Sequence, residues 1–121
     1  MRPMRLPRKF SMTQRAEFAR VREYGKSRPG RYLVVSVLQE PELDHFKLGF
    51  IVTKKVGKAH LRNLLRRRFR AIIQKHGDQL KTDRYIVTIA RWRAVEASFH
   101  ELEKDWLKQA RHFGLLKEVP E

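Results

Sequence analysis

The chain has 121 residues, of which 41% are hydrophobic, and this is enough for a single folded domain over residues 1–121. It has no cysteine, which excludes disulfides and cysteine-ligated zinc or iron–sulfur sites and suits a reducing compartment. The longest apolar stretch, near residues 32–38, is far shorter than the ~20 residues that span a membrane. The basic N-terminus also lacks the apolar core of a secretory signal. We therefore expect a soluble, cytoplasmic protein.

Charge is the most informative property of the composition. The chain has 28 Lys and Arg residues against 13 Asp and Glu residues, a net charge of +15 and an isoelectric point near 11.0. Residues 54–70 carry eight basic side chains and no acidic one. A field this strong and uneven attracts phosphate groups. No basic segment has the Trp, Phe and Leu face of a membrane-surface helix, so the charge predicts a nucleic-acid partner and no membrane.

The first third of the chain predicts a basic extended segment, a helix and a loop. Residues 1–12 are basic and contain two prolines. A helix follows over residues 13–24, with Ser11 or Thr13 as its N-cap and Gly25 at its C-terminal end. Residues 26–31 contain a Pro-Gly turn signal and are predicted to be a loop.

The middle and end of the chain predict three strands and two helices. Residues 32–39 are rich in β-branched side chains, and residues 46–52 alternate between two faces, so these two strands are expected to form a hairpin. A helix over residues 59–76 and a strand over residues 83–90 follow. Ser98 and Glu101 have the spacing of a capping box, which opens a last helix with one apolar stripe: Phe99, Leu102, Trp106, Ala110 and Phe113.

These elements give the order α-β-β-α-β-α, with room for one extra short strand. The order predicts an α+β fold in which the helices pack on a sheet as a small α/β sandwich. Trp92 follows the last strand and is open to two interpretations, as a core residue or as a residue at the rim.

The helix over residues 59–76 has two chemically different faces. At ~100° per residue, Leu61, Leu65, Phe69 and Ile72 cluster on one side. The opposite arc holds Asn63, Arg66, Arg67 and Arg70, with Arg62 at its edge. Arg68 lies nearer the apolar side, from which its long side chain can reach solvent. An ordinary solvated helix face mixes the two signs of charge, whereas this arc has no acid, so we expect it to bind phosphates.

The segment before this helix adds a second group of cations. Lys54, Lys55 and Lys58 surround Gly57 just before the helix begins. Free N–H groups and the helix dipole attract anions at such a position. The glycine spacing does not match a nucleotide-binding loop, and no acidic metal ligand follows, so nucleotide hydrolysis is not expected.

These residues resemble a known family. The segment FIVTKKVGKA (residues 50–59), followed by Arg62-Asn63 and Arg66-Arg67, is similar to the signature of the bacterial ribonuclease P protein subunit. The segments at residues 15–21 and 83–91 resemble that family's first helix and later strand, in the same order. The resemblance implies a fold like that of the second domain of ribosomal protein S5, with the arginine-rich helix in a left-handed crossover.

The resemblance also implies a function. In this family a large RNA is the catalyst and uses Mg²⁺ to remove the 5′ leader of precursor tRNA, while the protein assists and is inactive alone. The implied partners are that catalytic RNA and the leader, with no obligate protein partner. No catalytic or metal-binding residue is implied in the protein itself. By position, the residues facing the catalytic RNA would be Lys54, Lys55, Lys58, Arg62, Asn63, Arg66, Arg67 and Arg70.

A cleft between the first helix and the sheet would hold the leader. The residues implied to line it are Phe18, Arg22, Tyr32, Ser36 and Phe50. Phe18 and Phe50 suit base stacking, although each also fits a core position. Leu64 stands where the family usually has arginine, and Arg22 and Ser36 stand where some relatives have aromatic residues.

Two other functions fit parts of the sequence. A nuclease with its own acid–base pair would need two histidines brought together by folding, and the five are scattered: His45, His60, His76, His100 and His112. A structural ribosomal protein, or another RNA-binding protein without a catalytic partner, has similar size and charge. Only the ordered resemblance argues against that alternative.

Overall fold

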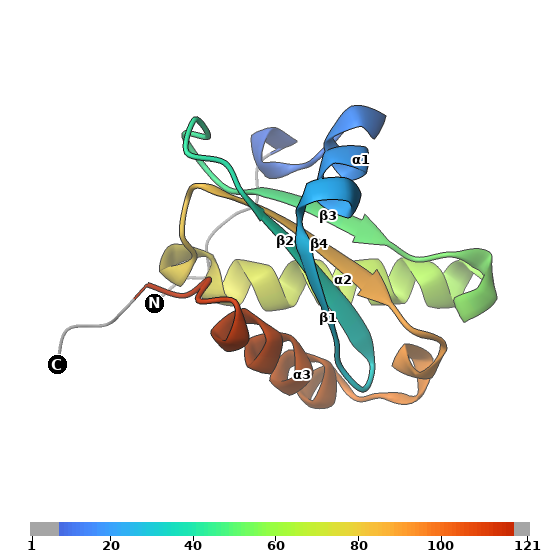
Figure 1. Ribbon diagram of the computed structural model, residues 1–121. Helices are drawn as coiled ribbons and strands as arrows, with labels where there is room; N and C mark the ends of the chain where they lie inside the picture. The colour runs from blue at the N-terminus through green and yellow to red at the C-terminus, as the bar shows by residue number, and fades with distance from the viewer. Residues whose placement is uncertain (1–7, 118–121) are drawn as a thin grey trace, which may run out of the picture.

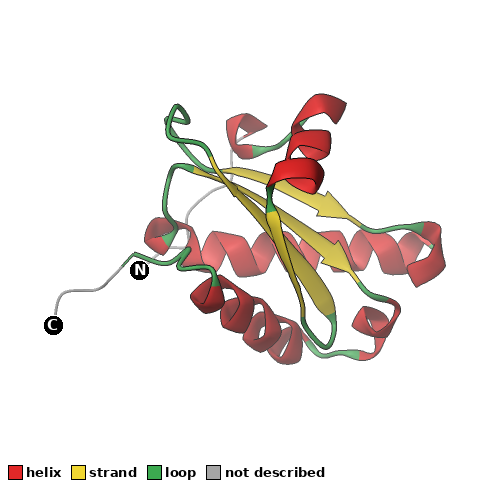
Figure 2. Ribbon diagram, in the orientation of Figure 1, coloured by secondary structure: helices red, strands yellow, loops and turns green. Residues whose placement is uncertain are grey.

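The computed structural model describes residues 8–117, and within them four strands form one sheet in the order β1-β2-β4-β3. The strands are β1 Lys26–Pro29, β2 Leu33–Gln39, β3 Lys47–Ile51 and β4 Arg84–Ala90. The α-helices are α1 Arg15–Tyr24, α2 Ala59–His76 and α3 Phe99–His112. Helices α2 and α3 cover one face of the sheet, and α1 lies on the other (Figure 1, Figure 2). The predicted α+β sandwich is confirmed, with α1 added on the second face.

Two predictions about the sheet are wrong. Strand β2 pairs antiparallel with β1 and β4, while β3 pairs parallel with β4, so β2 and β3 form no hairpin. Residues 26–29, predicted to be a loop, form the edge strand β1. They form a strand because they pair with the outer edge of β2, and no apolar pattern of their own marks them.

The N-terminal segment covers the outer edge of β3. The predicted extended segment over residues 1–12 falls partly outside the described residues, and its residues Arg8–Phe10 form the 3-10 turn η1. Ser11 then bridges Leu48 in parallel, and the Met12 N–H donates to the Leu48 carbonyl at 2.8 Å. These contacts satisfy backbone groups that an open sheet edge would expose.

The connection β3–α2–β4 places the basic helix behind the sheet. Because β3 and β4 are parallel neighbours, α2 runs back along one face between them, and the crossover is left-handed, the rarer hand (Figure 1). The carboxyl ends of both strands therefore meet at one end of the sheet. There the 3-10 turns η2 (Lys54–Val56) and η4 (Trp92–Glu96) pack against each other.

The main core lies between the sheet and helices α2 and α3. Leu33, Val35 and Val37 of β2 point into it, as alternation along a strand requires. Trp106 of α3 is buried there, and its indole N–H donates to the Thr88 hydroxyl of β4 at 3.1 Å. The predicted capping box is present, because the Glu101 N–H donates to the Ser98 hydroxyl and the Ser98 N–H to the Glu101 carboxylate.

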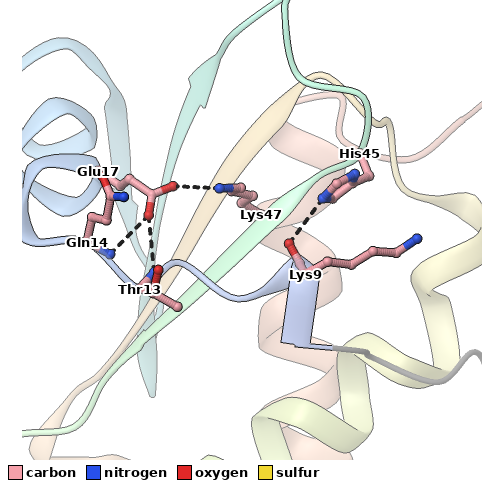
Figure 3. A network of polar contacts seen from close by, with 6 residues as sticks. All are labelled: Lys9, Thr13, Gln14, Glu17, His45 and Lys47. Carbon is pink, nitrogen blue, oxygen red and sulfur yellow. Dashed lines mark hydrogen bonds and ion pairs between the residues drawn. The ribbon is translucent and has the colours of Figure 1, made fainter.

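Besides its apolar packing on the sheet, helix α1 is linked to β3 by one carboxylate. The Glu17 carboxylate accepts the N–H groups of Thr13 and Gln14 and pairs with Lys47 of β3 at 3.1 Å (Figure 3). Gln14 is the N-cap residue, so the predicted cap at Ser11 or Thr13 is wrong. Burial raises the pKa of Glu17, but the N–H groups and Lys47 outweigh it and hold the pKa below its ordinary value.

Replacing Glu17 by glutamine should make the free energy of unfolding less dependent on pH in the acidic range. A carboxyl whose folded pKa is depressed stabilises the fold above its unfolded pKa, near 4.5, and loses this effect as the pH falls through the folded pKa. We expect Glu17→Gln to lower the free energy of unfolding at pH 7 by about 1 kcal/mol. Urea unfolding at pH 7 and pH 3 measures the difference, which should shrink at pH 3. A difference of the same size at both pH values would contradict this role.

Candidate nucleic-acid interface

Helix α2 has the two faces that its sequence predicts. Its bounds match the prediction, and Leu65, Phe69, Ile72 and Ile73 are buried against the sheet and α3. On the opposite side Asn63, Arg67 and Arg70 are exposed, and Arg62 and Arg66 are half-buried. No acidic residue lies within this helix. The predicted arc of cations is therefore present on the surface.

The arginines of this helix differ in whether their side chains already form hydrogen bonds within the protein. Arg66 donates to the Asn63 side chain at 3.2 Å and to the Val52 carbonyl at 3.3 Å. Arg68 donates to the Ala97 carbonyl at 3.0 Å, so it holds a neighbouring turn and does not extend freely into solvent. Within residues 8–117, Arg67 and Arg70 have no side-chain hydrogen bond or ion pair, so both guanidinium groups are available to an external phosphate.

The connector before α2 continues the basic surface. Lys54, Lys55 and Lys58 are exposed around the turn η2. Gly57 has a φ of 157°, a conformation that residues with a Cβ rarely adopt, and it turns the chain into the helix. Lys58 is the N-cap residue of α2 and its side chain makes no capping hydrogen bond, which leaves the N–H groups of Ala59 and His60 open to an anion.

On the other face of the sheet, α1 and the strands place some of the residues predicted to bind the leader. The half-buried Phe18 ring lies directly over Gly49 of β3, because a Cβ at Gly49 would come within 2.5 Å of it. Arg22 is exposed on α1. Ser36 lies on this face of β2 but is buried, and its hydroxyl is 2.6 Å from that of Ser27. Phe18 and Arg22 are therefore the groups here that a ligand can reach.

The structure separates Tyr32 and Phe50 from this face, contrary to the prediction of one cleft lined by all five residues. Phe50 points to the opposite face, where its ring centroid lies 6.2 Å from that of Phe69 on α2. The Tyr32 hydroxyl donates to Glu101 on α3 at 2.9 Å, and this hydrogen bond raises the pKa of Tyr32. Strand parity places Phe50 on the side opposite to Gly49, since neighbouring positions face opposite ways. Tyr32 precedes β2, and its contacts with α3 set its direction.

Three titratable groups on α2 and α3 form one structural contact. His76 and Lys75 both contact the Glu103 carboxylate, at 3.2 and 3.0 Å, and tie α2 to α3. Burial raises the pKa of Glu103, but these two partners outweigh it and keep the pKa below its ordinary value. In residues 8–117 no three His, Asp or Glu side chains form a group suited to a metal ion.

Sequence reasoning missed a third group of cations, after β4. Arg91 and Arg93 flank Trp92 at the same end of the sheet as the lysine connector, and all three are exposed. The signal in the sequence was a pair of arginines around an aromatic residue. Only the parallel pairing of β3 and β4 shows that this group adjoins residues 53–58.

No helix of the described region has the length and apolar character to cross a membrane.

Comparison with known proteins identifies the family to which the chain belongs. Residues 6–114 match the family model of ribonuclease P. The chain belongs to the bacterial ribonuclease P protein family. It is 36% identical to the ribonuclease P protein component of Syntrophomonas wolfei over 110 residues, which cover 91% of this chain and 92% of that protein. It is 32% identical to the corresponding protein of a Geobacillus species over 112 residues, covering 93% and 97%.

Solved structures show the same relationship. The ribonuclease P protein of Staphylococcus aureus matches with a TM-score of 0.83 and 28% identity, covering 89% of this chain and 98% of that one. The Thermotoga maritima ribonuclease P protein matches with a TM-score of 0.75 and 28% identity, covering 90% and 99%. The predicted family is confirmed, and the chain is the protein component of an endoribonuclease that acts in tRNA processing.

Proposed function

We propose that this ribonuclease P protein binds the catalytic RNA of the enzyme through α2 and the preceding connector. The observation that carries the proposal is the acid-free arc of α2, where the exposed Arg67 and Arg70 have no polar partner within the described residues. Guanidinium groups held on a rigid helix suit bidentate contacts with phosphate. Lys54, Lys55, Lys58, Arg62, Asn63 and Arg66 extend the same surface.

The second part of the proposal concerns the substrate. We infer that the surface beside α1 receives the single-stranded 5′ leader of precursor tRNA. Phe18 supplies a half-buried ring for base stacking, and Arg22 a cation for a leader phosphate. Tyr32 and Phe50 contribute nothing to this surface, because they lie against α3 and α2.

Catalysis is assigned to the RNA and its Mg²⁺ ions. Phosphodiester cleavage by a protein needs clustered carboxylates or histidines. The described part of the chain offers no such group to hold a metal ion, so its residues fit a role in binding and not in metal catalysis. We place the protein in the cytoplasm with its RNA, without an obligate protein partner.

Reconstitution tests the proposal. The protein would be mixed with a bacterial ribonuclease P RNA and a labelled precursor tRNA at low Mg²⁺, with each component also tested alone. Cleavage at the mature 5′ end only with both protein and RNA is the expected result. Cleavage by the protein alone would refute the assignment of catalysis to RNA. Inactivity with several such RNAs would favour a ribosomal or other RNA target instead.

The variant Phe18→Ala should distinguish the leader from the rest of the substrate. Loss of a stacked base costs about 1–3 kcal/mol, so affinity of the reconstituted enzyme for precursor tRNA should fall about 5- to 150-fold. Affinity for mature tRNA should change little, because it has no leader. Filter binding to both RNAs measures the difference. Equal losses for both would show that Phe18 acts only by packing against Gly49.

A further inference from the structure

One end of the sheet carries an exposed tryptophan that the proposed contacts do not use. Trp92 in η4 is 56% exposed, whereas Trp106 in the core is 1% exposed. Among residues 8–117, Trp92 and Tyr24 are the large hydrophobic side chains on the surface. Tryptophan is highly buried on average, so an indole with this exposure is unusual, and its surroundings decide what it can bind.

The surroundings of Trp92 are cationic. The Arg93 guanidinium lies over the indole, with its Cζ 4.9 Å from the ring centroid. The turn η2 packs against η4 and brings Lys54 and Lys55 to the same end of the sheet (Figure 1). Glu96 is the one acidic residue in these two turns, and it forms no ion pair within the described region. The positive charge around Trp92 therefore favours a polyanion as the partner. It does not favour a neutral partner or a protein surface with few acidic residues.

The turn that carries Trp92 is held in place from three directions. Ala94 is fully buried beneath it, and the Ala94 N–H donates to the Arg91 carbonyl at 2.9 Å. The Arg91 guanidinium donates to the Gly30 carbonyl at 2.7 Å, which ties the turn to the β1–β2 connection. Arg68 of α2 donates to the Ala97 carbonyl at 3.0 Å. A platform fixed in this way loses little conformational freedom when a ligand binds.

We propose that Trp92 is a stacking site for one unpaired nucleotide of an RNA that lies along the lysine connector. The indole offers its flat surface to a base, Arg93 reinforces the stack, and the lysines of η2 take the adjoining phosphates. Stacking tolerates any base, so the site selects unpaired RNA and not a particular sequence. The inference rests on the proposed function, because it adds a site to the same RNA-binding surface.

Tryptophan fluorescence of the full chain, titrated with decamers of uridine and of adenosine, tests this site. Stacking should quench the emission of Trp92, while the buried Trp106 should remain unquenched. Trp92→Leu keeps an apolar side chain without an aromatic face and should weaken decamer binding about 5- to 150-fold. The matched variant Trp92→Phe keeps an aromatic face and should retain most of the affinity. Neither variant removes a charge, so the salt dependence of binding should stay unchanged.

Two outcomes would overturn the inference and leave the proposed function standing. One is equal decamer affinity for Trp92→Leu and the unaltered protein. The other is a loss of affinity that is accompanied by a lower unfolding midpoint, which would mean a structural role. In both cases Lys55→Ala should still flatten the salt dependence. Absence of RNA binding by the unaltered protein, together with inactivity in the reconstituted cleavage assay, would instead refute the proposed function.

Discussion

The double variant Arg67→Ala/Arg70→Ala is expected to bind the catalytic RNA about 100-fold more weakly at moderate salt. Each charged hydrogen bond to phosphate contributes about 1.5 kcal/mol or more, and the two side chains have no internal partner to compensate within residues 8–117. Each lost phosphate contact also reduces counterion release. The log–log slope of affinity against salt should therefore fall by about 1.4–1.8 in total.

A matched control separates phosphate contact from total charge. Lys108→Ala/Arg111→Ala removes two exposed cations from α3 and changes the net charge by the same amount. This control should leave the salt slope nearly unchanged, because those residues lie outside the proposed surface. Filter binding at several salt concentrations, with the same RNA, measures both variants. Equal slopes for the two double variants would show that Arg67 and Arg70 act only through the overall field.

The variant Trp106→Ala is expected to destabilise the fold by about 3–5 kcal/mol, the usual range for removing a large buried aromatic side chain. The indole fills the space between α3 and the sheet and also satisfies the buried Thr88 hydroxyl. Thr88→Val should cost less, about 1–3 kcal/mol, because it leaves the indole in place but its N–H without a partner. Urea unfolding at pH 7 measures both changes.

Trp92→Ala provides the natural control for this comparison. It removes the same side chain from an exposed position, and surface substitutions of this kind usually change stability by less than about 0.5 kcal/mol. Comparable destabilisation by Trp92→Ala and Trp106→Ala would contradict the different burial of the two indoles.

The helices were predictable because their signals are local. The period of Leu65, Phe69 and Ile72 fixes the buried face of α2, and the pairing of Ser98 with Glu101 fixes the start of α3. The same periodicity placed Arg67 and Arg70 on the exposed arc. The exposure of these two arginines follows from helical geometry alone, without information on which elements pack against the helix.

The errors arise where a residue's position depends on a distant strand. Strand β1 has exposed, polar residues and exists because it pairs with β2. Nothing in the sequence of β2 or β3 indicates that β4 lies between them. The five residues predicted to line one cleft do not share a face, and only the contacts of Phe50 with Phe69 and of Tyr32 with Glu101 show which side each ring occupies.

The central place of β4 also governs the order in which the protein can fold. It is the last of the four strands within residues 8–117, yet it joins β2 on one side and β3 on the other. The sheet cannot grow strand by strand from the N-terminus, and its closure requires contacts between distant residues, which slows folding. During synthesis, residues 54–70 leave the ribosome before β4 does. The most basic part of the chain is therefore exposed to the surrounding solution while its own fold is still incomplete.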